Sequence, residues 1–453
     1  MTNEFDGKGR WPSRYGRASL VAVAALVAVT VLVQVSTASP EWGQWGGPNR
    51  NFQVDSKGLA DKWPEDGPKK LWSRELGDGY STILVDGDTL YTMYRAGETE
   101  FEFTIALDAK TGKTRWEHKN ESPFTGLMKQ YGPGPSSTPL IAGERLFSIG
   151  ANMVMHCFDK KSGKVHWKHD LVKEYGASVP GRGYCASPTA YKKIVIVTVD
   201  HPRDKEEGEP SGDDEAKVEP KKKAKRQTLF AFDQQSGQVV WRKQDLTFSH
   251  SSPVLIDVDG EAQMVLATAR GLIGFNPETG DLLWQHPLVE GGAYISTPVW
   301  TGDELIYCSS AYEGGSHAFR LTKKDGKTTV EELWYSRKIR IHHGNAIRLG
   351  DYVYASSGDM GPAFLGAINI HTGKTAWRER GFSKANFVYG DSKAIILDED
   401  GQLALATLSP EGLHILSKCT VAERYAWAAP TLAGTTLYIR DRKHIMAFDL
   451  SAE

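Results

Sequence analysis

An acidic residue, a glycine and a tryptophan stand at a spacing that could form a catalytic site. Asp108 is followed by Gly112 and then by Trp116, with three residues between the members of each pair. These types would suit a site with a catalytic carboxylate, a tight turn and an aromatic wall, because a carboxylate can take up or release a proton. If the unit occurred once, it would be a candidate active site.

The unit recurs, and the recurrence indicates a structural role. An active site needs its carboxylate once, whereas a repeated turn needs the same residue types in every copy. The further copies contain Asp159, Gly163 and Trp167; Asp233, Gly237 and Trp241; Gly280 and Trp284; and Gly373 and Trp377. In each of them the tryptophan follows the glycine by four residues. We therefore predict that these residues fasten repeats of the fold and do not catalyse.

Each copy is typical of a strand, a turn and a second strand. An alternating apolar run precedes the acidic or amide residue, whose side chain can cap backbone N–H groups two residues further on. The glycine supplies the positive φ that many hairpin turns require. The tryptophan stands on the second strand, where we expect it to pack between neighbouring repeats.

Two more short strands precede each unit, so every repeat is expected to have four antiparallel strands. The first of these strands begins with small residues and a proline. The signatures lie at residues 137–139, 186–188, 251–253, 296–298 and 428–430, with looser versions starting at 81, 345 and 386. A four-stranded unit repeated about every fifty residues is typical of a β-propeller. Eight such first strands predict an all-β, eight-bladed β-propeller over residues 40–453.

The two ends of the predicted propeller should close the ring together. The last repeat stops at Ile445–Asp449, before a tryptophan can follow, and a strand with Trp72 near the start could supply the missing partner. An N-terminal strand that joins the C-terminal blade would remove an open sheet edge.

The first 39 residues carry an export pattern. Four basic residues precede an uncharged stretch at 18–40, and a small-residue cleavage site stands at 36–38. This order is typical of a signal peptide. Because the uncharged stretch is just long enough to cross a bilayer, an uncleaved inner-membrane anchor at residues 18–40 stays open as the alternative. Both interpretations send the rest of the chain to the periplasm or cell envelope.

The charge balance argues against a nucleic-acid partner. The chain has 54 Lys and Arg residues against 56 Asp and Glu, a net charge of −2, and a nucleic-acid binder would need a basic face.

A highly charged stretch at residues 203–226 falls between two predicted strands. Such a composition cannot bury a core, so we expect a disordered, solvated insertion there.

The sequence contains no recognisable motif for thiol, metal or hydrolase chemistry. No Gly-x-Ser-x-Gly elbow, His-Glu-x-x-His motif or phosphate-binding glycine loop occurs. His342 and His343 are adjacent, and neighbouring residues of a strand point to opposite faces, so we do not expect them to share a metal. The cysteines are widely spaced and are expected to be buried free thiols: Cys157, Cys185, Cys308 and Cys419.

The repeats resemble the pyrroloquinoline-quinone (PQQ) type, which quinoprotein dehydrogenases share with the BamB family of outer-membrane protein assembly factors. The resemblance covers nearly all of residues 42–450. Residues 42–50, WGQWGGPNR, look like the opening of exported BamB-like proteins, and residues 427–430 and 437–440 look like their closing part. Because one fold hosts many activities, the resemblance implies the propeller more firmly than a function.

The quinoprotein side of the resemblance implies a site that can be tested. Those enzymes hold the quinone between a tryptophan and a ring of two adjacent bonded cysteines, and they chelate calcium with carboxylate and amide groups. This chain has no adjacent cysteines, and Asp78 is the closest acidic residue to the expected site. Calcium needs several oxygen ligands. We therefore expect no cofactor, no metal and no catalytic residue, with PQQ and calcium kept as the alternative.

A binding site is expected where the loops that enter the first strands converge on the pore. These loops offer nine polar or aromatic residues: Tyr80, Ser136, Tyr184, His250, Tyr294, His343, Asn345, Asn386 and Trp427. Such a ring could bind a small molecule or a peptide. The alternative is that each of the nine packs against or caps its own strand.

The leading interpretation is an exported, non-enzymatic propeller that serves as a BamB-like protein-interaction scaffold at the cell envelope. Its partners are then envelope proteins or peptides, and it meets the membrane only through an uncleaved N-terminal segment. No cysteine lies near the cleavage site, so the lipid anchor usual for BamB is missing. The alternatives are a PQQ-dependent sugar or alcohol dehydrogenase and a carbohydrate- or peptide-binding propeller.

Overall fold

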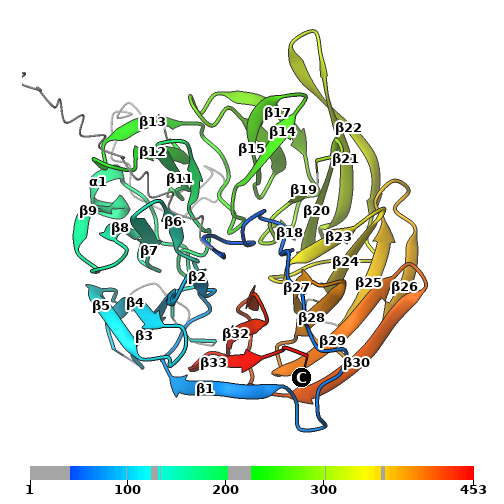
Figure 1. Cartoon of the computed structure of the whole chain (residues 1–453). Helices are drawn as coiled ribbons and strands as arrows, with labels where there is room; N and C mark the ends of the chain where they lie inside the picture. Colours follow the sequence, from blue (N-terminus) through cyan, green and yellow to red (C-terminus); the bar gives the residue numbers. More distant parts are fainter. Residues whose placement is uncertain are drawn as a thin grey trace, which may run out of the picture. The chain divides into compact units, whose positions relative to one another are not determined.

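Four-stranded sheets radiate from a central pore, with the first strand of each blade innermost (Figure 1). The computed structural model describes residues 41–97, 99–123, 131–132, 134–201, 226–300, 302–358 and 363–452. All of them belong to one compact unit, Ser39–Glu453. The predicted export segment 1–39 lies outside the described residues, as does the predicted insertion 203–226 apart from Arg226. Of the helices in the described part, none is long and apolar enough to cross a membrane.

The first four blades follow one another along the chain. The first blade contains β2 (Leu84–Asp86), β3 (Thr89–Arg95), β4 (Phe101–Asp108) and β5 (Thr114–Glu121). The second contains β6 (Leu140–Ala142), β7 (Arg145–Ile149), β8 (Val154–Asp159) and β9 (Val165–Asp170), followed by the short helix α1 (Leu171–Tyr175). The third contains β10 (Thr189–Tyr191), β11 (Ile194–Thr198), β12 (Leu229–Asp233) and β13 (Val239–Lys243). The fourth contains β14 (Val254–Val258), β15 (Glu261–Ala267), β16 (Gly271–Phe275) and β17 (Leu282–Pro287).

The next three blades repeat the pattern with one variation. In the fifth blade the innermost strand is split in two: β18 (Gly292–Ala293), β19 (Val299–Trp300), β20 (Leu305–Tyr312), β21 (Gly315–Lys324) and β22 (Lys327–Ser336). The sixth contains β23 (Ala346–Leu349), β24 (Tyr352–Ser357), β25 (Phe364–Asn369) and β26 (Thr375–Glu379). The seventh contains β27 (Asn386–Gly390), β28 (Lys393–Leu397), β29 (Gln402–Ser409) and β30 (Gly412–Thr420).

The eighth blade closes the ring as predicted. Its strands are β31 (Thr431–Ala433), β32 (Thr436–Arg440), β33 (His444–Asp449) and β1 (Lys69–Glu75). β1 pairs antiparallel with β33, with Trp72 opposite Ala447 and Glu75 opposite His444. The predicted eight-bladed propeller, closed by an N-terminal strand, is confirmed.

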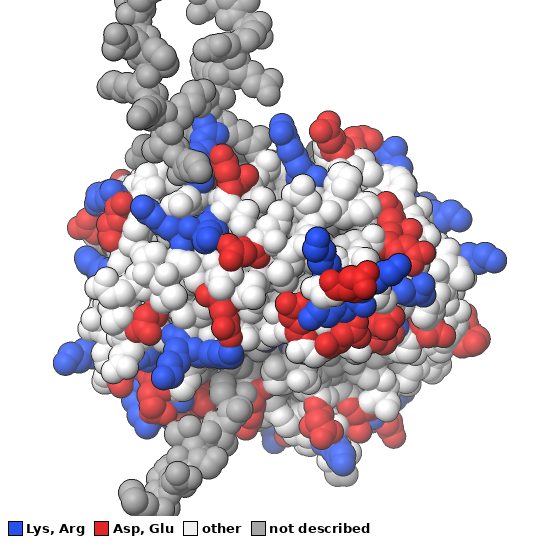
Figure 2. Space-filling model, turned by 90° about the horizontal axis from the view of Figure 1, so that it is seen from above, with Lys and Arg blue, Asp and Glu red and all other residues white. Residues whose placement is uncertain are grey.

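Burial along the strands explains why the blades stack. All seven residues of β3 are buried, because this strand lies between neighbouring blades on both faces. The outer strand β5 alternates instead between exposed and half-buried residues. Viewed edge-on, the ring shows Lys and Arg interspersed with Asp and Glu, without a large area of one sign (Figure 2).

The repeated tryptophans join each blade to the next one. The Trp72 Nε1–H donates to the Ala109 carbonyl at 2.9 Å, and the Trp116 Nε1–H donates to the Lys160 carbonyl at 2.8 Å. Trp167, Trp334 and Trp377 donate to the equivalent turns of the blades that follow them. These tryptophans therefore contact the glycine turn of the following blade and not the glycine of their own unit. Trp284 differs, because its Nε1–H donates to Gln263 Oε1 of its own blade at 2.7 Å.

The acidic residue and the glycine of each unit shape that turn. The Asp108 carboxylate accepts from the Thr111 N–H at 2.9 Å, and the Gly112 N–H donates to the Asp108 carbonyl at 2.8 Å. Gly112 has φ +68°, and a Cβ there would lie 2.7 Å from the Trp72 ring. The turn thus requires glycine for its backbone conformation and for the close approach of the neighbouring indole.

Replacing Gly163 by alanine should destabilise the propeller more than the same change at Gly143. Both have a positive φ, +71° and +58°, which costs an alanine about 1–2 kcal/mol. At Gly163 the new Cβ would also lie 2.6 Å from the Trp116 ring, whereas nothing lies within 4 Å at Gly143. Overpacking adds about 1–3 kcal/mol. Urea unfolding of both variants measures the difference, and equal losses would contradict the fastening role of Trp116.

Candidate functional site

The N-terminal segment closes one end of the pore. Trp42 exchanges backbone hydrogen bonds of 3.0 Å with Val85 at the end of the first strand of blade one. Gln53 bridges to Tyr389 in the seventh blade. Between these anchors Trp45 reaches the pore, where its Nε1–H donates to Thr297 Oγ1 at 2.8 Å. The motif at residues 42–50 therefore places a tryptophan at the inner end of the pore.

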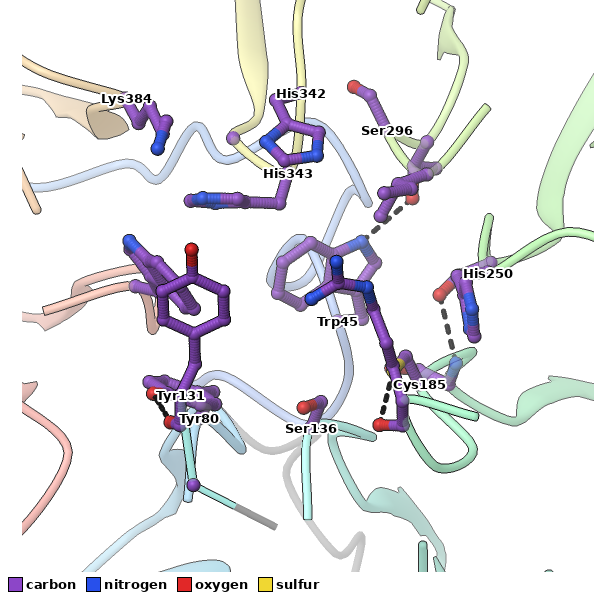
Figure 3. Close-up of a pocket in the computed structure, with 18 of the residues that line it drawn as sticks. Trp45, Tyr80, Tyr131, Ser136, Cys185, His250, Ser296, His342, His343 and Lys384 are labelled. Atoms are coloured by element: carbon purple, nitrogen blue, oxygen red, sulfur yellow. Dashed lines mark hydrogen bonds between the residues drawn. The ribbon is translucent and has the colours of Figure 1, made fainter. Parts of the chain in front are cut away.

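A pocket of about 230 Å³ lies where the innermost strands begin, and Trp45 is part of its lining. We call it the pore-mouth pocket. Figure 3 shows Trp45 at its centre, with His342 and His343 on one side and Tyr80, Tyr131 and Ser136 on the other. The residues that line it are Trp45, Tyr80, Tyr131, Gly132, Ser136, Arg182, Cys185, Ser187, His250, Ser252, Ile295, Ser296, Thr297, Tyr312, His342, His343, Gly344, Lys384 and Trp427.

A simple alternation decides which strand-entry residues reach the pocket. The residue directly before each small-residue signature lines it in seven of the eight blades: Tyr80, Ser136, Cys185, His250, Ile295, Gly344 and Trp427. The residue after it is buried in most blades, as Ser81, Ala186 and Ala428 are. The fifth blade, whose innermost strand is split, is an exception, because Ser296 lines the pocket beside Ile295. Successive residues of an extended chain point to opposite sides, so one step in register moves a side chain out of the pocket.

The structure brings five of the nine predicted residues together and places four elsewhere. Tyr80, Ser136, His250, His343 and Trp427 line the pocket. The other four are buried behind its wall: Tyr184, Tyr294, Asn345 and Asn386.

Each of these four residues has a partner inside the fold. The Tyr184 hydroxyl lies 3.3 Å from Thr198 Oγ1, and the Tyr294 hydroxyl donates to the Val289 carbonyl at 3.2 Å. Asn386 Nδ2–H donates to the Trp427 carbonyl at 3.0 Å. Asn386 therefore supports the backbone of a pocket residue without facing the pocket.

Several residues that line the pocket were not predicted from the sequence. Cys185 follows the register described above and could have been found from it. Trp45 belongs to the N-terminal motif, but only the fold shows that the motif reaches the pore. Arg182, Tyr312 and Lys384 lie outside the signatures, and no pattern in the sequence marks them.

Trp427 is the aromatic centre of the pocket. Its ring centroid lies 4.5 Å from that of His343, 5.0 Å from those of Tyr80 and Tyr425, and 5.3 Å from that of Tyr131. Its Nε1–H donates to Glu399 Oε2 at 2.9 Å. The indole is thus fixed at its edge while its neighbours form an aromatic wall, which suits contact with a flat or apolar group.

The charged groups that line the pocket are cationic. Arg182 and Lys384 line it, and no lining residue in the described part of the chain is a carboxylate. Glu399 lies behind Trp427, with Lys384 Nζ at 3.4 Å and a hydrogen bond of 2.8 Å from the Ser383 hydroxyl. Burial alone would raise the pKa of Glu399, but the bonds from Trp427 and Ser383 and the charge of Lys384 hold it below its usual value.

Burial favours the neutral form of two pocket histidines, His250 and His343. Burial lowers the pKa of His250 to about 4, with a further contribution from the charge of Arg182. Burial, followed by the neighbouring His342, lowers the pKa of His343 well below its usual value. The two adjacent histidines lie in a loop and both line the pocket, with ring centroids 5.0 Å apart. The expectation that they face opposite sides was wrong, because β23 starts only at Ala346.

Acidification should weaken the folded state through His250. The unfolded imidazole takes up a proton below pH 6.5, whereas the folded one resists until about 4. The unfolding free energy therefore falls as the pH drops through this window. Between pH 6.5 and 4, we expect the unfolding free energy of His250→Gln to fall by about 1–2 kcal/mol less than that of the unchanged protein. Urea unfolding at both pH values measures this, and an unchanged loss in the variant would contradict the assignment.

The donor groups around the pore do not fit calcium-bound PQQ. The lining offers no carboxylate, and no group of three or more His, Cys, Asp or Glu in the described residues could hold a metal. All four cysteines are free; Cys157 and Cys308 are buried as predicted, whereas Cys185 and Cys419 are only half-buried. Burial raises the pKa of the Cys185 thiol to about 11, so it is not a thiolate nucleophile at neutral pH.

A family model and several solved structures match the chain. The model, described as outer membrane protein assembly factor BamB, matches residues 102–379, more than half of the chain. BamB from Moraxella catarrhalis has a TM-score of 0.59 and 16% identity over 84% of this chain and 99% of that chain. No curated protein matches in sequence.

Quinoproteins have the same fold. A europium-containing methanol dehydrogenase has a TM-score of 0.63 and 11% identity over 90% of this chain and 98% of that chain. A quinohemoprotein alcohol dehydrogenase from Comamonas testosteroni has a TM-score of 0.60 and 12% identity over 92% of this chain and 82% of that chain. At these identities the likeness shows the fold alone.

Proposed function

This chain belongs to the family of outer membrane protein assembly factor BamB, and on that premise we propose that it is an exported, non-enzymatic propeller that binds proteins or peptides at the cell envelope. The observation that carries the proposal is the pore-mouth pocket. It is concave and aromatic, and its described lining includes cations but no carboxylate. Such a lining suits recognition, whereas calcium-dependent quinone chemistry needs carboxylate ligands.

The pocket also has polar atoms that lack a partner. Both ring nitrogens of His343 and Nδ1 of His250 are buried without a hydrogen bond to any residue that the structure describes. A buried polar atom without a partner costs about 1–3 kcal/mol, so such atoms favour an external partner. They support the assignment of the pocket as the place where a ligand binds.

Export and envelope location rest on the sequence. The basic start, the uncharged stretch at 18–40 and the small residues at 36–38 favour a signal peptide or an inner-membrane anchor. The family name describes an outer-membrane assembly factor, which agrees with a role in the envelope. In this proposal the propeller lies in the periplasm, where the pore-mouth pocket presents a binding surface.

Affinity capture from envelope extracts tests the binding role. We expect the tagged chain to retain reproducible envelope partners and Trp427→Ala to lose them. Capture that is equal for both, or no partner at all, would contradict the proposal. In a separate arm, the purified protein is mixed with PQQ and calcium. We expect no cofactor spectrum and no dye reduction, and the appearance of both would establish the dehydrogenase alternative.

A further inference from the structure

We propose that the pore-mouth pocket receives an acidic side chain of a partner peptide, with an aromatic neighbour of that side chain packed against Trp427. This inference rests on the proposed function, because it names the chemistry of the partner at the same site. The charge, the buried polar atoms and the size of the pocket support it.

Two cations approach the pocket from opposite sides of the ring. Arg182 precedes the innermost strand of the third blade, and Lys384 precedes that of the seventh, four blades away. The Arg182 guanidinium lies 5.9 Å from the Tyr131 ring and makes no ion pair with a described residue. Lys384 Nζ lies 6.0 Å from the Trp427 ring and 3.4 Å from Glu399 Oε2, so Arg182 is the cation that lacks a described carboxylate partner. A carboxylate beside Arg182 would gain charge-assisted hydrogen bonds that the described lining does not supply.

The histidines add donors without adding charge. A neutral imidazole carries one N–H, and neither nitrogen of His343 has a partner among the described residues. The His343 ring lies 4.5 Å from the Trp427 ring, so its N–H is available beside the aromatic wall. One side of the pocket can thus contact a flat group while the adjacent imidazole donates to an oxygen.

The pocket has room for an acidic side chain. Its volume is about 230 Å³. Trp45 stands at its inner end and is held by Thr297, so a ligand enters from one side only. One acidic side chain and part of an aromatic neighbour match this space, and the rest of the peptide stays outside.

Fluorescence anisotropy with two labelled peptides tests the inference. The centre of one peptide reads Glu-Phe-Asp and that of the matched peptide reads Gln-Phe-Asn. With the full chain we expect the acidic peptide to bind about tenfold more tightly. Arg182→Gln should reduce the difference to about twofold, and Arg182→Lys should preserve most of it. Lys110→Gln removes a cation from an exposed turn far from the pocket and should change nothing.

Three results would overturn the inference: equal binding of both peptides, binding of neither, or an unchanged preference in Arg182→Gln. If envelope capture still depends on Trp427 in that case, the proposed function survives and only the acidic specificity fails. If the peptides are distinguished as expected but envelope capture fails, the pocket chemistry holds and the proposed envelope role does not.

Discussion

Replacing Arg440 by alanine is expected to cost about 3–5 kcal/mol of unfolding free energy, because the residue fills the seam where the ring closes. Arg440 is fully buried at the end of β32. Its guanidinium donates to the carbonyls of Met93 at 2.7 Å and Gly77 at 3.1 Å, both in or beside the first blade. The change would leave these buried acceptors without a donor and open a cavity between the first and last blades.

Arg74→Ala is the matched control for this seam. Arg74 lies on β1 and is half-buried, and it donates to the Gly112 carbonyl and to Thr114 Oγ1, both at 3.0 Å. Water can replace it there, so the expected loss is about 1 kcal/mol. The two midpoints of urea unfolding give the comparison. Similar losses for Arg440→Ala and Arg74→Ala would show that the buried guanidinium does not hold the seam.

The second large effect is expected at Trp427, on binding. Trp427→Ala removes the ring that contacts His343, Tyr80 and Tyr131. Aromatic residues at the centre of a pocket typically contribute about 2–4 kcal/mol to binding. We therefore expect affinity for the acidic peptide to fall about thirtyfold or more. Titration by fluorescence anisotropy measures the loss.

Two further variants show whether that loss reflects the pocket. Trp377→Ala removes a tryptophan that joins two blades through the Ser409 carbonyl at 2.8 Å, far from the pocket. It should lower stability and leave affinity unchanged. Trp427→Phe keeps an aromatic ring and loses only the bond to Glu399, so it should retain part of the affinity. If Trp377→Ala weakened binding as much as Trp427→Ala, the effect would come from general destabilisation.

The repeat made the fold predictable. Asp108, Gly112 and Trp116 share a turn geometry that recurs because every blade requires the same turn and the same packing. The ring closure followed from an incomplete last repeat and an unassigned strand with Trp72. What the repeat did not reveal is that Trp72 and Trp116 bond to the turn of the following blade, because that contact depends on the stacking of blades and not on a single unit.

The pocket was only partly predictable, for a physical reason. Where the register of a strand entry was right, as at Tyr80 and Trp427, the side chain lines the pocket. Tyr184 stands one residue before Cys185, and this single step turns it into the core. Arg182 and Lys384 lie outside the signatures. They are far apart in the sequence, and the closed ring brings both to the same pocket. Their convergence is a property of the closed ring.

Photo-crosslinking in the cell envelope tests most directly whether the pore mouth is the binding site. A photoreactive phenylalanine analogue is placed at Tyr131, which lines the pocket, and separately at Tyr335, which is exposed on the outer strand β22. We predict a discrete adduct with an envelope protein or peptide from position 131, lost when Trp427→Ala is added, and none from position 335. Adducts from position 335 alone, or from neither position, would contradict the account.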